Sequence, residues 1–290
     1  MSNNISKAHS VKNKVSSTLI DLLRRNSFDK GNQLAYTFLV DGGAEKIDLT
    51  YGELDRRSRA IGASLQLAGA TGERVLLLYP PGVEFITAFL GCLYAGAIAV
   101  PAYPPRPNRS DLRLQKIIAD TQAAVALTTK IALSRVDRAF GEASYMKNLR
   151  WLATDEIVRE SEQKWREPSI NGDTLAMIQY TSGSTSAPKG VMISHSNLLS
   201  NERMIQEAFH QTEESIIVGW LPLYHDMGLI GNVFQPLFLG ARCVLMSPTA
   251  FLQKPLRWLQ AISDYRATTS GGPNFAYDLC VRKISPDERA

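Results

Sequence analysis

The sequence predicts an α/β fold in which parallel sheets are flanked by helices and arranged in layered βα subdomains. Short runs rich in Val, Ile and Leu alternate with helical patterns along most of the 290 residues. This alternation is typical of parallel sheets connected by helices. Hydrophobic residues make up 44% of the chain and charged residues 21%, which is enough apolar material for a large core. A chain of this length exceeds the usual size of one compact domain, so we expect one large domain or two packed ones.

The expected strands are short and follow one another regularly along the chain. They are residues 75–79, 98–103, 124–129, 150–154, 175–181, 190–194, 216–221 and 241–246, followed by a strand-like run at 267–270. Helical patterns separate them, among them residues 51–66, 110–121 and 254–266. A further helix is expected to carry one apolar face, formed by Val83, Ile86, Phe89, Leu90 and Leu93. Ser110 is suited to cap the helix that begins there.

One segment has the hydropathy of a membrane span. Residues 85–105 contain no charged side chain, and about 20 apolar residues are enough to cross a bilayer. Gly96 and Pro101, however, divide the segment into a helix-like part and a short strand-like part. A strand and a helix buried inside an α/β domain give the same hydropathy as a membrane helix. We therefore expect no membrane span.

Composition disfavours several other classes of protein. The formal net charge of +4 comes from scattered Lys and Arg, whereas nucleic-acid-binding domains concentrate basic residues on one face. We therefore expect no nucleic-acid partner. Cys92, Cys243 and Cys280 are widely spaced and odd in number, which favours buried, reduced thiols in a cytoplasmic protein. Residues 1–17 are rich in Ser, Asn and Lys and lack the apolar stretch of a secretory signal. We expect a flexible lead-in there, with a transit peptide as the alternative.

The strongest motif is YTSGSTSAPKG at residues 180–190. It places five Ser and Thr side chains, two glycines and a lysine between two predicted strands. Backbone N–H groups, hydroxyl donors and one cation are the groups that bind a polyphosphate. The Walker loop differs, because its lysine follows a glycine and a helix begins at once. A flexible Ser/Gly-rich hairpin is the structural alternative. The apolar strands on both sides and the Pro-Lys-Gly end favour phosphate binding.

A second motif, GWLPLYHDMGLIG, occupies residues 219–231. Pro222 is expected to end a strand and to place Tyr224, His225 and Asp226 in a loop. Small residues then alternate with large apolar ones, which fits either a narrow ligand channel or close helix packing. Taken alone, His225 fits a hydrogen-bonded structural residue better than a catalytic one.

A third motif, GGPNFAYDLC, occupies residues 271–280. A glycine pair directly after a strand suggests a backbone that a ligand approaches closely. An ordinary strand-to-helix turn explains the same residues without a ligand.

The motif at 180–190 resembles the phosphate-binding signature of the adenylate-forming superfamily, T-S-G-[ST]-T-G-x-P-K-G. Ser186 departs from it, because most of the superfamily has glycine at that position. The second motif is similar to the acyl-site motif of the same superfamily. The Ser186 departure, GGPNFAY and the segment VPAYPPRPNR at 100–109 resemble the fatty acyl-AMP ligase branch in particular. The helix at 51–66 resembles a structural motif of the family and is given no catalytic role.

The resemblance implies roles for individual residues. It places the ATP phosphates against Thr181, Ser182, Gly183, Ser184, Thr185, Lys189 and Gly190. It implies catalytic roles for Lys189 and His225. The acyl or adenylate pocket would include His225, Met227, Gly228, Gly231, Gly271, Gly272, Pro273 and Asn274. The reaction would use Mg²⁺, but we expect no metal ligand within these 290 residues.

The resemblance also implies an activity. We expect ATP-dependent activation of a long-chain fatty acid to its acyl-adenylate, with transfer to an acyl carrier protein or a polyketide synthase. Two alternatives remain open: a long-chain acyl-CoA synthetase and a non-catalytic nucleotide-binding fragment. The resemblance covers only about the first half of a family member. Residues 18–290 are therefore expected to form the N-terminal part of an AMP-binding domain, incomplete at its C-terminal end and inactive alone.

Overall fold

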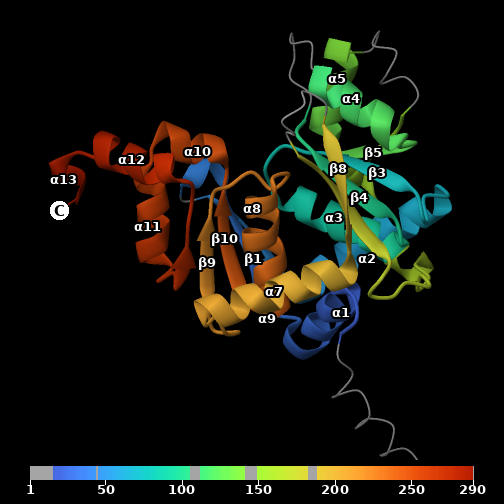
Figure 1. Ribbon diagram of the computed structural model, residues 1–290, viewed down its shortest axis with the longest axis horizontal. Helices are drawn as coiled ribbons and strands as arrows, with labels where there is room; N and C mark the ends of the chain where they lie inside the picture. The colour runs from blue at the N-terminus through green and yellow to red at the C-terminus, as the bar shows by residue number, and fades with distance from the viewer. Residues whose placement is uncertain (1–15, 44, 105–111, 141–148, 182–187, 290) are drawn as a thin grey trace, which may run out of the picture.

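The computed structural model describes residues 16–43, 45–104, 112–140, 149–181 and 188–289, which form two sheets and the helices around them (Figure 1). The five-stranded sheet has the order β11-β9-β10-β1-β2, with β1 (Leu34–Leu39), β2 (Lys46–Thr50), β9 (Ile216–Gly219), β10 (Arg242–Met246) and β11 (Thr269–Ser270). The six-stranded sheet has the order β6-β5-β3-β4-β7-β8, with β3 (Arg74–Leu78), β4 (Ile98–Ala102), β5 (Val125–Thr128), β6 (Arg150–Ala153), β7 (Leu175–Thr181) and β8 (Lys189–Ser194).

Each sheet is parallel except for one edge strand. β2 runs antiparallel to β1, and β8 runs antiparallel to β7. The connections from β1 to β2 and from β7 to β8 are short, and a parallel crossover needs a dozen or more residues. The predicted α/β fold with parallel sheets is confirmed. β1 and β2 were not predicted from the sequence, nor was the antiparallel direction of β8.

Most of the long helices lie between the two sheets. This middle layer contains α1 (Leu19–Lys30), α2 (Tyr51–Leu67), α3 (Val83–Ala95), α7 (His195–Phe209), α8 (Asp226–Leu229), the π-helical turn η4 (Ile230–Phe234) and α9 (Gln235–Leu239). The main core cluster joins these helices to the inner faces of both sheets, for example to Leu77 of β3 and Leu245 of β10. The layered arrangement expected from the sequence therefore has helices as its central layer.

Other helices cover the outer faces of the sheets. α10 (Pro248–Gln253), α11 (Leu256–Asp264) and α12 (Asn274–Lys283) pack on the five-stranded sheet, and α4 (Leu112–Thr121) packs on the six-stranded sheet. α5 (Lys130–Phe140) contacts β6, and α13 (Pro286–Arg289) follows α12. Alternate residues of a strand enter different cores: Leu77 faces the middle layer, whereas Leu76 and Leu78 face α4.

The position of α3 explains the uncharged segment at 85–105. The sequence predicted one apolar face, but 12 of the 13 residues of α3 are buried, because the helix has a sheet on either side. The strand expected after it is β4. Within the described ranges, no helix combines the length and the apolar character that crossing a membrane requires.

Several element boundaries differ from the predicted ones. β9 ends at Gly219, two residues before the predicted end, and α11 spans Leu256–Asp264 rather than 254–266. α1 was not predicted, although Thr18 and Asp21 form a capping box at its start. Ser110 and residues 1–15 lie outside the described residues, so the predicted cap and most of the lead-in are not tested. The three cysteines are buried and free.

A buried carboxyl group on α7 makes folding dependent on pH. The side chain of Glu202 is fully buried, and turning the amide of Gln235 so that its nitrogen faces Glu202 places that nitrogen 2.6 Å from Oε2 of Glu202. Burial raises the pKa of Glu202 from 4.5 to about 8. The folded chain therefore holds a proton that the unfolded chain loses, and this contribution to stability falls as pH rises from about 4.5 to about 8.

We expect Glu202→Gln to raise the melting temperature at pH 8 and to change it little at pH 5. The neutral amide imitates the protonated carboxyl group, and the cost removed at pH 7 is of order 3 kcal/mol. The measurement is thermal unfolding of both proteins at pH 5, 6, 7 and 8. Burial lowers the pKa of His195 to about 4, but this effect is common to both proteins and cancels. A difference that does not change with pH would contradict the assignment.

Candidate active site

The β7–β8 hairpin positions the predicted phosphate-binding lysine. Thr181 pairs with Lys189, and Tyr180 pairs with Gly190, so Lys189 opens β8 at the tip of the described hairpin. The side chain of Lys189 is exposed to solvent. A Cβ atom at Gly190 would lie 2.7 Å from Cγ2 of Ile178 and 3.2 Å from Cζ of Tyr180. Close packing therefore accounts for glycine at this position.

Four of the predicted phosphate-binding residues are not located. Ser182, Gly183, Ser184 and Thr185 lie outside the described residues. Their roles remain predictions. Thr181 ends β7 and Lys189 begins β8, and the two residues are paired at the tip of the described hairpin.

His225 lies at the junction between a loop and a helix. Its backbone N–H donates to the carbonyl of Pro222 at 3.1 Å, and its own carbonyl accepts from Leu229 at 2.8 Å. His225 is thus the N-cap residue of α8, and Asp226 is the first residue of that helix rather than a loop residue as predicted. Nδ1 of His225 lies 2.5 Å from Oδ1 of Asp226 in an exposed pair. The imidazole is held by Asp226 and is open to a ligand.

The hairpin and the His225 loop are in direct contact. Nε2 of Gln179, on β7, donates to the backbone carbonyl of Tyr224 at 3.2 Å. The ring of Tyr224 also meets Tyr103, just after β4, with ring centroids 6.2 Å apart. The carboxyl ends of β4 and β7 and the His225 loop therefore converge, at the edge where open α/β sheets bind ligands.

The glycines after His225 differ in their surroundings. A Cβ atom at Gly228 would lie 2.9 Å from the carbonyl carbon of Pro222 and closer still to its oxygen. A Cβ atom at Gly231 would meet nothing within 4 Å. Gly228 is thus explained by close packing, whereas Gly231 borders open space. Gly231 also lies in the π-helical turn η4, a feature that is frequent at functional sites. Met227, at the start of the same helix, is 47% exposed.

The third motif packs against Trp220, which belongs to the second motif. β11 pairs with β9, and Gly271, Gly272 and Pro273 follow it before α12 starts at Asn274. A Cβ atom at Gly272 would lie 3.0 Å from Cζ2 of Trp220, whereas one at Gly271 would meet nothing within 4 Å. Trp220 is the residue that begins the His225 loop, so the structure brings the second and third motifs together.

Two positioning residues were not predicted. The sequence pattern places Gln179 within a predicted strand and Trp220 near the end of another, and it predicts no further role for either residue. Trp220 stacks on Phe251 with ring centroids 3.9 Å apart, which holds the start of the His225 loop against the outer core. The aromatic residues near Gly271 in the sequence could have suggested an aromatic contact for Trp220. No local pattern marks Gln179 as a positioning residue.

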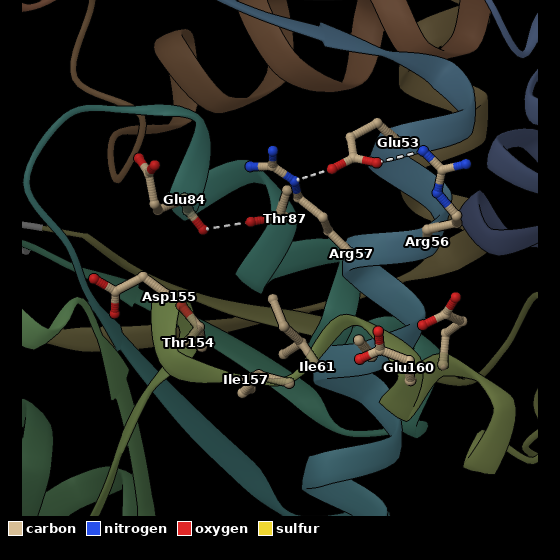
Figure 2. A pocket seen from close by; sticks show the side chains of 12 residues that line it. Glu53, Arg56, Arg57, Ile61, Glu84, Thr87, Thr154, Asp155, Ile157 and Glu160 are labelled. Carbon is tan, nitrogen blue, oxygen red and sulfur yellow. Dashed lines mark hydrogen bonds and ion pairs between the residues drawn. The ribbon is translucent and has the colours of Figure 1, made fainter.

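A cavity of about 430 Å³ lies elsewhere, between α2, α3 and the 3-10 turns η2 (Thr154–Glu156) and η3 (Arg159–Lys164) (Figure 2). Of the described residues that line it, none belongs to the three motifs. Its arginines, Arg56 and Arg57, both pair with Glu53, at 2.5 and 2.7 Å. The other charged residues of its lining are acidic: Glu84, Asp155, Glu160 and Glu162. An acidic lining repels a polyphosphate, so the nucleotide is not placed there.

The part of the chain that the structure describes contains no group of three or more His, Cys, Asp or Glu side chains placed to hold a metal ion.

The family model for AMP-binding enzymes matches residues 24–290, and the chain therefore belongs to the AMP-binding enzyme family. It is 48% identical over 278 residues to the medium-chain-fatty-acid–[acyl-carrier-protein] ligase JamA of Moorena producens, covering 94% of this chain and 47% of JamA. It is 36% identical over 304 residues to TtuA of Teredinibacter turnerae, a ligase of the same name, covering 92% of this chain and 47% of TtuA.

Solved structures agree with this assignment. The fatty acyl-adenylate ligase of L. pneumophila, in complex with acyl adenylate and pyrophosphate, superposes with a TM-score of 0.88 at 42% identity, covering 94% of this chain and 47% of that one. The more distant McyG A-PCP, at 21% identity and a TM-score of 0.86, shares the fold. The chain spans about half the length of the curated relatives it matches.

Proposed function

We propose that the protein uses ATP to convert a fatty acid into its acyl-adenylate, with release of pyrophosphate, for transfer to an acyl carrier protein or a polyketide synthase. The observation that carries this proposal is the hydrogen bond from Gln179 to the carbonyl of Tyr224. It joins the strand of the phosphate hairpin to the loop of His225. An acid held near His225 would therefore lie close to the phosphates held near Lys189. The similarity to JamA, TtuA and the L. pneumophila ligase supports the same reaction.

The ammonium group of Lys189 and the imidazole of His225 suit this chemistry. The nucleophile is a carboxylate, which is already an anion, so no general base is needed. The barrier comes from repulsion between the carboxylate and the triphosphate and from charge that develops on pyrophosphate. Positioning and positive electrostatics lower such a barrier. Lys189 would hold the β- and γ-phosphates, and Mg²⁺ entering with the nucleotide would neutralise further charge.

His225 would contact the carboxylate of the acid. We expect His225→Ala to lower acyl-adenylate formation about tenfold, or ~1.4 kcal/mol, because a polar contact to the reacting group is lost. Asp226→Asn should have a smaller effect, because Asp226 holds the ring rather than the substrate. The measurement is hydroxamate trapping of the acyl-adenylate at saturating ATP, with both variants made in the full-length translation product. A larger loss in Asp226→Asn than in His225→Ala would contradict these roles.

Two molecules are candidates for the acceptor of the acyl group: acyl carrier protein and CoA. JamA and TtuA are named as ligases for acyl carrier protein, but FadD21 of Mycobacterium bovis, 36% identical over 281 residues, is named as a putative fatty-acid–CoA ligase. A CoA ligase is therefore the second candidate. The long-chain preference implied by the resemblance stays a prediction, and the names of JamA and TtuA specify medium chains.

The full-length translation product that carries this sequence provides the test. It is incubated with ATP, Mg²⁺ and fatty acids of graded length, with either acyl carrier protein or CoA. We expect pyrophosphate release and an acyl-carrier thioester. Formation of acyl-CoA would support the second candidate instead. ATP binding without any acyl-adenylate would support the third reading, a non-catalytic nucleotide-binding protein, and would overturn the proposed reaction.

A further inference from the structure

We propose that Arg113 on α4 is a second positively charged contact for the polyphosphate of the nucleotide, in addition to Lys189. This inference rests on the proposed function, because it requires a nucleoside triphosphate at the β7–β8 hairpin. Arg113 lies 67 residues before Tyr180 and outside the motif at 180–190. The fold, rather than a local sequence pattern, brings it to the site.

The geometry places Arg113 and Lys189 at the same end of the hairpin. Nη2 of Arg113 donates to the backbone carbonyl oxygen of Tyr180 at 3.5 Å. Tyr180 and Thr181 are the last residues of β7, and they pair with Gly190 and Lys189 at the start of β8. The guanidinium of Arg113 and the backbone of Lys189 therefore lie at the same end of the described hairpin.

Tyr180 also fixes the orientation of α4. Its hydroxyl group donates to Oδ2 of Asp120 at 2.5 Å, and its ring packs in one cluster with Leu114 and Ile117. Burial and the Asp120 hydrogen bond raise the pKa of Tyr180, so the hydroxyl keeps its proton and remains a donor. The carbonyl of Tyr180 meets Arg113, and its hydroxyl meets Asp120, about two helical turns further along. α4 is therefore attached to the hairpin at two points. This attachment sets the position of the Arg113 guanidinium.

The charge of the ligand explains why a second cation is useful. A triphosphate carries several negative charges, and the attacking carboxylate adds another. Lys189 supplies one point charge, whereas a guanidinium can donate two parallel hydrogen bonds to a phosphate. The contact of Arg113 with a neutral carbonyl, at 3.5 Å, is at the limit for a hydrogen bond. A phosphate group at the hairpin would offer the guanidinium a stronger partner at little cost.

Nucleotide binding tests this proposal, with Arg113→Gln and Arg113→Lys in the full-length translation product. Arg203→Gln is the matched control, because Arg203 is an exposed arginine of α7 and its loss changes the net charge equally. Dissociation constants are measured by equilibrium dialysis for ATP, pyrophosphate and AMP. We expect Arg113→Gln to weaken ATP and pyrophosphate binding about tenfold, Arg113→Lys to weaken them less, and AMP binding to change by less than about twofold, because AMP lacks the outer phosphates. The control should bind all three ligands normally.

The outcomes separate this inference from the proposed function. Equal weakening of ATP and AMP by Arg113→Gln would show a general disturbance of the site and overturn the inference. Unchanged ATP binding in Arg113→Gln, with weakened binding in Lys189→Ala, would overturn the inference and leave the proposed function intact. If the unsubstituted protein binds neither ATP nor pyrophosphate, the proposed function fails and the inference fails with it. Should Arg113→Gln melt at a much lower temperature, Arg113→Lys alone decides, and normal ATP and AMP binding by that variant would count against the inference.

Discussion

Replacing Lys189 by alanine in the full-length translation product is expected to slow pyrophosphate release at least about tenfold, or ~1.4 kcal/mol of transition-state stabilisation. Lys189 is the first residue of β8, its side chain is exposed, and its backbone is fixed opposite Thr181. The backbone from which its side chain extends toward a ligand is therefore held in a defined position. A neutral methyl group cannot replace a cation that faces the charge developing on pyrophosphate. The measurement is continuous detection of pyrophosphate with saturating fatty acid and ATP.

The control for this variant is Lys46→Ala. Lys46 lies in β2, on the other sheet, and pairs at the surface with Asp48 at 3.3 Å. Surface pairs of this kind contribute little to stability, so the control changes the net charge equally and should release pyrophosphate at the normal rate. If Lys189→Ala also keeps that rate, the hairpin does not hold the phosphates and the proposed function is wrong.

The fold could be predicted from sequence wherever local patterns are strong. The strand at 75–79 is β3 within one residue, and the helix at 51–66 is α2. β1 was missed, although five of its six residues are buried, because a single short apolar run does not distinguish a strand from a helix. The antiparallel direction of β8 depends on the shortness of the connection from β7, and no hydrophobic pattern within β8 encodes it.

The candidate site likewise combines residues that local motifs predicted with contacts that no local motif predicts. Lys189 and His225 belong to local motifs and were predicted by resemblance, and their roles stay predictions. The contact of Gln179 with Tyr224 joins residues 45 positions apart, and that of Arg113 with Tyr180 joins residues 67 apart. Tertiary contacts of this kind follow from how strands and helices pack, and single-sequence patterns do not record them.

Gly228 and Gly231 have the same sequence pattern around them, and only their packing in the structure distinguishes their roles. In the sequence both are small residues among large ones, and either could line a ligand channel or permit close packing. The structure separates them. Gly228 faces the backbone of Pro222, where an added Cβ atom would overlap the carbonyl group, and Gly231 faces open space.

We expect Gly228→Ala to destabilise the protein by about 2 kcal/mol, which is typical of overpacking against atoms that cannot easily move. The obstacle is backbone, so the loop that carries His225 must shift, and acyl-adenylate formation should fall even at temperatures where the protein stays folded. Gly231→Ala should leave stability unchanged or raise it by up to about 1 kcal/mol, because alanine favours helix over glycine. The two variants add the same methyl group three residues apart, so each is the control for the other.

Their kinetics should differ as well. If the open space beside Gly231 receives the acyl chain, the methyl group of Gly231→Ala narrows it, and KM for the longest accepted fatty acids should rise while KM for ATP is unchanged. Gly228→Ala should instead lower kcat for all acids alike, since it displaces His225 rather than the chain. The measurements are thermal unfolding and a kcat and KM profile over fatty acids of graded length. Equal loss of stability in both variants would contradict the packing difference, and a chain-length effect confined to Gly228→Ala would move the acyl pocket away from Gly231.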